Sequence, residues 1–165
     1  MDKQIIFDIS ALARANIGTS EHHSFEIPET KTSGQVEIMR TEEALSVKGK
    51  DIKTTVDFKC EKCLEDFSQA IEIPVFEREF LFEKPGEIED PNDIFLVDKK
   101  KLEIDLSEAL RQEIILHFPL IPVCSSGCRG LCPHCGINRN EKPCNCKDEE
   151  AEPNKPLAAL KDLIK

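Results

Sequence analysis

The chain has 165 residues, a length that suits one domain, or one domain with a small appendage, and that allows a buried core. Its 22 Lys and Arg residues stand against 32 Asp and Glu residues, which gives a net charge of −10. This balance argues against a protein that binds nucleic acid through its overall charge, because counterion release requires a basic face.

The N-terminal residues lack the basic start and the long apolar run of a signal peptide, and no stretch approaches the roughly 18 apolar residues of a membrane span. We therefore expect a cytoplasmic protein without membrane contact, whose thiols remain reduced. The first elements expected are a strand at residues 5–7, a helix at 11–15, and a turn at 18–21 followed by a loop that holds His22 and His23. Phe25 and Ile27 are expected to begin another strand.

Residues 35–82 predict an antiparallel β-sheet. Apolar and polar residues alternate through most of this stretch, which is the pattern of strands with one face in water. Beside Pro74 the large apolar residues move from odd-numbered to even-numbered positions. Such a shift next to a proline indicates a β-bulge or a bend in the strand.

Residues 105–118 predict an amphipathic helix. It is preceded by an acidic loop at residues 83–93 and a short strand at 94–97. Asp105 is the expected N-cap, and Glu108 three residues later completes a capping-box pattern. An apolar stripe would pack the helix on the sheet and consists of Leu106, Leu110, Ile114 and Phe118, with Ala109 and Ile115 beside it. Pro119 is expected to end the helix, because proline cannot continue the hydrogen-bond ladder.

Eight cysteines in a chain with reduced thiols indicate metal or redox chemistry before disulfides. Cys132 and Cys135, with Pro133 between them and Gly136 after them, have the form of a zinc knuckle, in which one turn aims both sulfurs at one ion. Zinc takes four ligands, so two more are needed. We favour a first site of Cys132, Cys135, Cys144 and Cys146, while Cys124 and Cys128 are the alternative partners of the knuckle pair.

Cys60 and Cys63 form a second C-x2-C pair at the end of a predicted strand. Three interpretations stay open: a redox pair, two packed structural thiols, and half of a second metal site shared with Cys124 and Cys128. A redox pair of the thioredoxin kind lies at a helix start after a strand, whereas the flanks here predict an antiparallel hairpin.

The segment 124–147 is basic, although the whole chain is acidic. Its cations are Arg129, Arg139, Lys142 and Lys147, and its only anion is Glu141. The segment therefore has a net charge of +3, and the rest of the chain has −13. These four cations would partly offset the charge of a zinc–thiolate centre, and they are the candidate contacts with RNA or a protein partner. With so little apolar content, the segment would be folded by zinc binding.

Together these patterns predict an α+β protein. A bent antiparallel β-sheet with one packed amphipathic helix forms the body at residues 1–123. A Cys-rich zinc module follows at residues 124–147, and an acidic linker with a short helix from Pro156 occupies residues 148–165. The sequence does not indicate the oligomeric state.

Three blocks of the sequence show a family resemblance. The first is 58–67; the second runs from 104–106 through 113–116 to Pro119 and 122–124; the third is 128–138 with 144–146, Pro153 and 157–160. In order and spacing, residues from about 45 to 164 resemble the YceD family, described as large ribosomal RNA subunit accumulation proteins.

The resemblance implies a non-enzymatic factor in the synthesis, processing or accumulation of large-subunit ribosomal RNA, and hence in ribosome assembly. Its partner would be the precursor of that RNA or a basic ribosomal protein, which an acidic body would attract. Two other functions stay open. One is a zinc module that only docks a protein, and the other is a thiol-disulfide oxidoreductase that uses Cys60 and Cys63.

Overall fold

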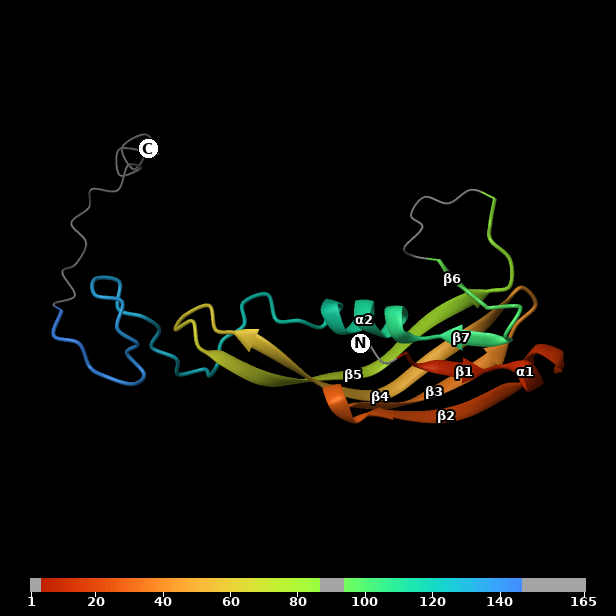
Figure 1. The fold of residues 1–165 in the computed structure, drawn as a ribbon, viewed down its shortest axis with the longest axis horizontal. Helices are drawn as coiled ribbons and strands as arrows, with labels where there is room; N and C mark the ends of the chain where they lie inside the picture. Colours follow the sequence, from red (N-terminus) through yellow and green to blue (C-terminus); the bar gives the residue numbers. More distant parts are fainter. Residues whose placement is uncertain (1–3, 87–93, 147–165) are drawn as a thin grey trace, which may run out of the picture.

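The computed structural model describes residues 4–86 and 94–146. The acidic stretch at 148–152, the helix expected from Pro156, and Lys147 lie outside the described residues. The elements in chain order (Figure 1) are β1 (Ile6–Asp8), α1 (Ser10–Arg14), β2 (Ser20–Ile27), the 3-10 turn η1 (Pro28–Thr30), β3 (Thr32–Arg40), β4 (Ala44–Lys59), β5 (Asp66–Leu81), β6 (Phe95–Leu96), β7 (Glu103–Asp105) and α2 (Ser107–Leu116). None of the helices in these ranges is long and apolar enough to cross a bilayer.

The main sheet has five strands in the order β2-β3-β4-β5-β6. The first four pair antiparallel with their sequence neighbours, as the alternating pattern predicts. β6 pairs with β5 in parallel, so the sheet is mixed rather than wholly antiparallel. The chain between β5 and β6 is long enough for the crossover that parallel pairing requires. The α+β class is consistent with this fold.

The shift of apolar positions at Pro74 is a bend shared by β4 and β5, and not a bulge between them. Their pairing keeps one register on both sides of Pro74. The buried positions change phase in both strands at this point, and Asp51 has a left-handed φ of 50°. The register irregularity lies instead between β3 and β4, at Ser33 and Gln35. Of the two alternatives that the sequence left open beside Pro74, a bulge or a bend, the structure has the bend.

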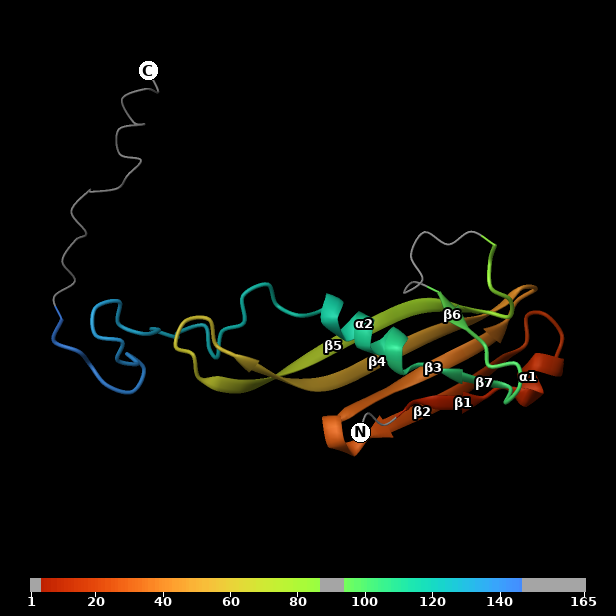
Figure 2. The ribbon, with the colours of Figure 1, turned by 45° about the horizontal axis from the view of Figure 1, so that its top comes forward.

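The hydrophobic core lies between the main sheet and a second layer on one of its faces. In both views this layer consists of α2 and the β1–β7 pair (Figures 1 and 2). The largest core side chains include Phe80 from β5, Leu12 from α1 and Ile104 from β7, all at most 1% exposed. An ion pair between Arg78 of β5 and the buried Glu113 of α2, with nitrogen and oxygen 2.8 Å apart, also joins the layers.

α2 is shorter than predicted and starts differently. Its N-cap is Leu106, which makes no side-chain capping bond, so the predicted capping box is wrong. Asp105 ends β7 and accepts a hydrogen bond from the Ser107 amide, while Glu108 pairs with Arg111. The predicted stripe packs on the core except for Ile115, which is 44% exposed.

The N-terminal predictions are confirmed for the strand and the short helix but not for β2. Phe25 and Ile27 end this strand instead of beginning it, and His22 and His23 lie within it rather than in a loop. The reason is that β2 pairs with β3 along its whole length, so tertiary pairing decides the conformation of its polar N-terminal half.

β4 and β5 continue beyond the rest of the sheet as a two-stranded stalk (Figure 1), which we define as residues 54–59 and 66–71. Phe58 in the stalk contacts the ring of Phe67 and, edge to face at 5.0 Å between centroids, the ring of Phe118. The chain that leaves α2 is thereby held against the stalk and led towards the hairpin tip.

We predict that Gly49→Ala destabilises the sheet. A methyl group at Gly49 would overlap the ring of Phe76, its buried partner on β5. Overpacking of this kind costs about 1–3 kcal/mol. The free energy of unfolding, measured by urea titration, should fall by that amount, and the urea midpoint should fall with it. Gly86→Ala, where a methyl group meets open space, should leave both nearly unchanged. Equal urea midpoints for the two variants would show that the Phe76 ring moves aside without loss of stability.

Candidate metal centres

All eight cysteine sulfurs gather into two groups of four. The first tetrad is Cys60, Cys63, Cys124 and Cys128, and the second tetrad is Cys132, Cys135, Cys144 and Cys146. Within each tetrad the four sulfurs lie within 4.8 Å of one another, so each group could hold a metal ion. All eight are free cysteines, without disulfides.

The first tetrad joins the tip of the β4–β5 hairpin to the chain that follows α2. In the tip, the Cys60 amide donates to the carbonyl of Glu65 and the Leu64 amide donates to the carbonyl of Cys60, both at 2.9 Å. This turn requires a left-handed conformation at Leu64, whose φ is 62°. It closes the hairpin so that Cys60 and Cys63 present their sulfurs together.

Backbone contacts hold the incoming chain on this tip. The Glu61 amide donates to the carbonyl of Pro122, and the Leu131 amide donates to the carbonyl of Lys62, both at 2.9 Å. Gly130 permits the second contact, because a Cβ atom at this position would lie 2.9 Å from the Lys62 carbonyl oxygen. The first tetrad is therefore assembled by hydrogen bonds on either side of it.

Three cysteines of the first tetrad are buried, Cys124 is half-buried, and their sulfurs are closely spaced. Cys60 is 0% and Cys63 is 3% exposed. The distance between sulfurs is 3.8 Å from Cys60 to Cys128 and 3.7 Å from Cys63 to Cys124. This small cluster is separate from the main core.

The surroundings of Cys60 favour its thiolate. Burial raises the pKa of this thiol, but backbone N–H donors of Cys124, Cys63 and Lys62 outweigh it and bring the pKa to about 6. At Cys63 the Glu65 backbone lowers the pKa, while burial and the neighbouring sulfurs raise it to about 12. Four thiolates so close together repel one another, and a bound cation removes that penalty.

The second tetrad has the predicted knuckle geometry. The Gly136 amide donates to the carbonyl of Cys132 at 2.9 Å, and Gly136 has a left-handed φ of 72°. The backbone amides of Cys135 and His134 lower the pKa of Cys132 to about 6. At the other end of the tetrad, the Cys135 side chain and burial raise the pKa of Cys146 to about 12. His134 is exposed and takes no part in the tetrad.

The structure thus brings together the four cysteines favoured for the first predicted site. The alternative, in which Cys124 and Cys128 complete the site of the knuckle pair, is wrong. These two cysteines lie with Cys60 and Cys63 instead. The Cys60–Cys63 turn connects two antiparallel strands rather than a strand and a helix, which is not the setting of a thioredoxin-type redox pair.

The candidate contact residues lie around the tetrads in different ways. Arg129 and Lys142 are exposed. Arg139 directs its Nη2 at the sulfur of Cys132, 3.8 Å away, so its guanidinium group contacts the second tetrad. Lys147 lies outside the described residues.

Asn140 is a site residue that the sequence pattern did not reveal. Its Nδ2 donates to the sulfur of Cys128 at 3.3 Å, and this hydrogen bond is the main cause of the lowered pKa of Cys128. In the sequence Asn140 has only the character of a turn residue. The contact depends on how the two tetrads pack together, which no spacing rule indicates.

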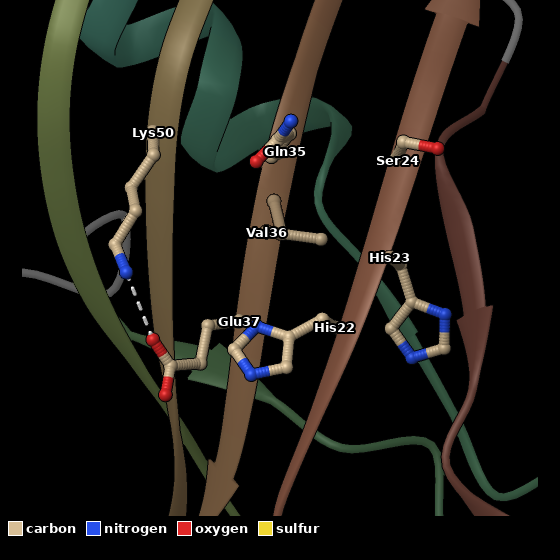
Figure 3. A pocket seen from close by; sticks show the side chains of 7 residues that line it. All are labelled: His22, His23, Ser24, Gln35, Val36, Glu37 and Lys50. Carbon is tan, nitrogen blue, oxygen red and sulfur yellow. Dashed lines mark hydrogen bonds and ion pairs between the residues drawn. The ribbon is translucent and has the colours of Figure 1, made fainter.

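A shallow pocket of about 260 Å³ lies over β2, β3 and β4 (Figure 3). His22 and His23 line it as consecutive strand residues, and their rings diverge, so they do not converge on a common ligand. Lys50 is engaged by Glu37, with nitrogen and oxygen 3.0 Å apart. The pocket offers no set of side chains comparable with the tetrads.

Comparison with known proteins identifies the family of this chain. The sequence model of the family described as "Large ribosomal RNA subunit accumulation protein YceD" matches residues 49–164, a range that holds both tetrads. The chain belongs to the YceD family. The family's description concerns large-subunit ribosomal RNA, and no catalytic reaction is part of it.

Two relatives carry the name "Large ribosomal RNA subunit accumulation protein YCED homolog 1, chloroplastic". The one from Arabidopsis thaliana is 35% identical over 63 residues, which are 38% of this chain and 20% of the relative. The one from Zea mays is 39% identical over 59 residues, which are 35% of this chain and 20% of the relative. The matches thus span about a fifth of the relatives' length. No solved structure matches the chain.

We predict that Gly130→Ala loosens the docking of the incoming chain on the hairpin tip. Alanine there would be strained by the φ of 69° and would also press on the Lys62 carbonyl. Gly136→Ala is the matched control, because its φ of 72° brings the same backbone strain of about 1–2 kcal/mol but its methyl group meets open space. Hydrogen exchange of the Leu131 amide should accelerate more in Gly130→Ala. Equal exchange in both variants would refute a specific role for the contact with Lys62.

Proposed function

We propose that this protein is a non-enzymatic factor for the accumulation of large-subunit ribosomal RNA, and that each of its tetrads binds one zinc ion. The observation that carries the proposal is the family match, which extends over both tetrads and most of the hairpin that supports them. We propose the cytoplasm as its setting, because eight free cysteines suit a compartment that keeps thiols reduced.

Zinc is supported by the donor set and its spacing. Sites with four thiolates are typical of structural zinc, and a Zn–S bond of about 2.3 Å places sulfurs about 3.8 Å apart at the edges of a tetrahedron. The two separations in the first tetrad, 3.8 and 3.7 Å, agree with that value. Four protein ligands leave no open position for a substrate, which favours a structural role over a catalytic one.

The zinc ions would hold the Cys-rich end, by which we mean residues 124–146, in one conformation. Cys60, Cys63 and Cys128, with a few partly buried neighbours, form a cluster too small to supply much hydrophobic stabilisation. Structural zinc contributes about 10–16 kcal/mol in small metal-folded domains, which is ample for this purpose. The ion in the first tetrad would fix the Cys-rich end to the stalk, and so to the body.

Charge favours a basic ribosomal protein as the direct contact over naked RNA. Two zinc ions with eight thiolates carry about −4, more than the +3 that residues 124–147 supply. The metal-loaded end is thus not a basic surface, and the rest of the chain is strongly acidic. A basic protein meets a complementary field on the body. In this proposal the candidate contacts of the Cys-rich end with the partner remain Arg129, Arg139, Lys142 and Lys147.

We predict two zinc ions per chain. Native mass spectrometry of protein purified without added metal should show about two, and Cys60→Ser with Cys63→Ser, or Cys132→Ser with Cys135→Ser, should leave about one. Ser126→Ala, an exposed hydroxyl in the same segment, is the control and should keep both. Protein that contains no zinc yet keeps the same fold would contradict the metal assignment.

We also predict that depletion of the protein lowers mature large-subunit ribosomal RNA and raises its precursor, while small-subunit RNA stays nearly constant as the internal control. Normal amounts of both RNAs would contradict the proposed function. Crosslinking in cells then identifies the contact: a ribosomal protein supports the partner favoured by charge, whereas RNA recovered from the Cys-rich end would overturn that choice.

A further inference from the structure

The two tetrads share one short stretch of chain. Cys128 is the last ligand position of the first tetrad and Cys132 is the first of the second, with 129–131 between them. This linking stretch is held on both sides. Leu131 donates its amide to the Lys62 carbonyl of the hairpin tip, and the Gly130 carbonyl accepts from the Arg139 amide, both at 2.9 Å. Neither tetrad can therefore shift without moving the stretch that both depend on.

Asn140 makes the most direct connection between the tetrads. Its Nδ2 donates to the sulfur of Cys128 at 3.3 Å, and its Oδ1 accepts from the Arg129 amide at 2.8 Å. The same Nδ2 also donates to Oδ1 of Asn138 at 2.9 Å, so both N–H groups of the amide are used. One side chain thus fixes a ligand of the first tetrad and the residue after it.

Asn140 itself belongs to the loop that the second tetrad closes. It lies between Cys135 and Cys144, which supply ligand atoms to that tetrad from either side of the loop. The loop is pinned further where Leu131 and Asn138 form an isolated β-bridge. An ion in the second tetrad would therefore determine whether Asn140 reaches Cys128.

We propose that the two metal sites load cooperatively, with Asn140 as the positioning residue that couples them. This inference rests on the zinc binding proposed above. The ion in the second tetrad orders the 135–144 loop, Asn140 then holds Cys128 and the Arg129 amide in place, and the first tetrad binds its ion more tightly. Because coupling free energies are reciprocal, an ion in the first tetrad strengthens the second by the same factor. Groups that orient metal ligands typically change metal affinity 10- to 100-fold.

The test is a double-mutant cycle on the full chain, with zinc affinity of the first tetrad as the readout. Competition with a chelator gives this affinity, and cobalt(II) spectra report whether four sulfurs surround the ion. One change disables the second tetrad, by Cys144→Ser with Cys146→Ser, and the other is Asn140→Ala. Each should weaken the first tetrad about 10- to 100-fold, and together they should weaken it no further, because both remove the same contact.

Two further variants separate positioning from general disturbance. Asn140→Asp keeps the acceptor for the Arg129 amide but replaces the donor to Cys128 with a carboxylate, so it should weaken the first tetrad at least as much as alanine does. Asn145→Ala, an exposed asparagine of the same module, should leave the affinity near that of the unaltered protein.

The outcomes distinguish this inference from the function it rests on. Two bound zinc ions with an unchanged first-tetrad affinity in Asn140→Ala, or losses that multiply in the combined variant, would overturn the coupling and leave the zinc proposal intact. Protein that binds no zinc would overturn both. The measurement involves no RNA, so a failed depletion experiment would not affect it.

Discussion

Four cysteine sulfurs within 4.8 Å of one another are the constraint on which the Cys-rich end depends. Like charges at this distance repel strongly once they leave bulk water. Burial raises the pKa of Cys60, but backbone N–H donors outweigh it and bring the value to about 6, whereas burial and the neighbouring sulfurs raise the pKa of Cys63 to about 12. Backbone amides stabilise the thiolate of Cys60, but amides alone do not stabilise four thiolates. The arrangement is therefore most stable with a cation at its centre, and the surrounding fold can be understood as the means of delivering four sulfurs to one point.

The stalk performs most of that delivery. A hairpin of two 16-residue strands is long enough to leave the layered body and carry Cys60 and Cys63 well beyond it. An isolated two-stranded ribbon is only marginally stable, so this one needs support along its length. Phe118, packed edge to face on Phe58, supplies it and at the same time guides the chain from α2 to the tip. The contact between Phe58 and Phe118 and the first tetrad thus hold the chain after α2 at two successive points.

The local part of this site could be predicted from the sequence, and the non-local part could not. Cys132, Cys135 and Gly136 lie on one turn, so their spacing alone defines the knuckle. Cys60 and Cys124 are 64 positions apart in the sequence, and their meeting depends on the bend at Asp51, the length of the stalk and the exit of α2. Sequence spacing contains none of those angles. The same limit explains the wrong capping box, because β7 pairs with β1 through Asp105 and so removes that residue from the helix start.

The two parts of the molecule are stabilised by different physical means, and this has a functional consequence. The body has a continuous apolar core between sheet and covering layer, and that core includes neither tetrad. At the Cys-rich end the most buried side chains are cysteines, which offer little apolar area and much ligand chemistry. Under the zinc proposal, loss of metal should therefore release the end while the body remains folded, so that the two do not unfold as a single two-state unit. A protein built in this way would keep its acidic body intact and lose only the shape of its Cys-rich end, so the zinc proposal implies that the conformation of that end, rather than the stability of the fold, responds to metal supply.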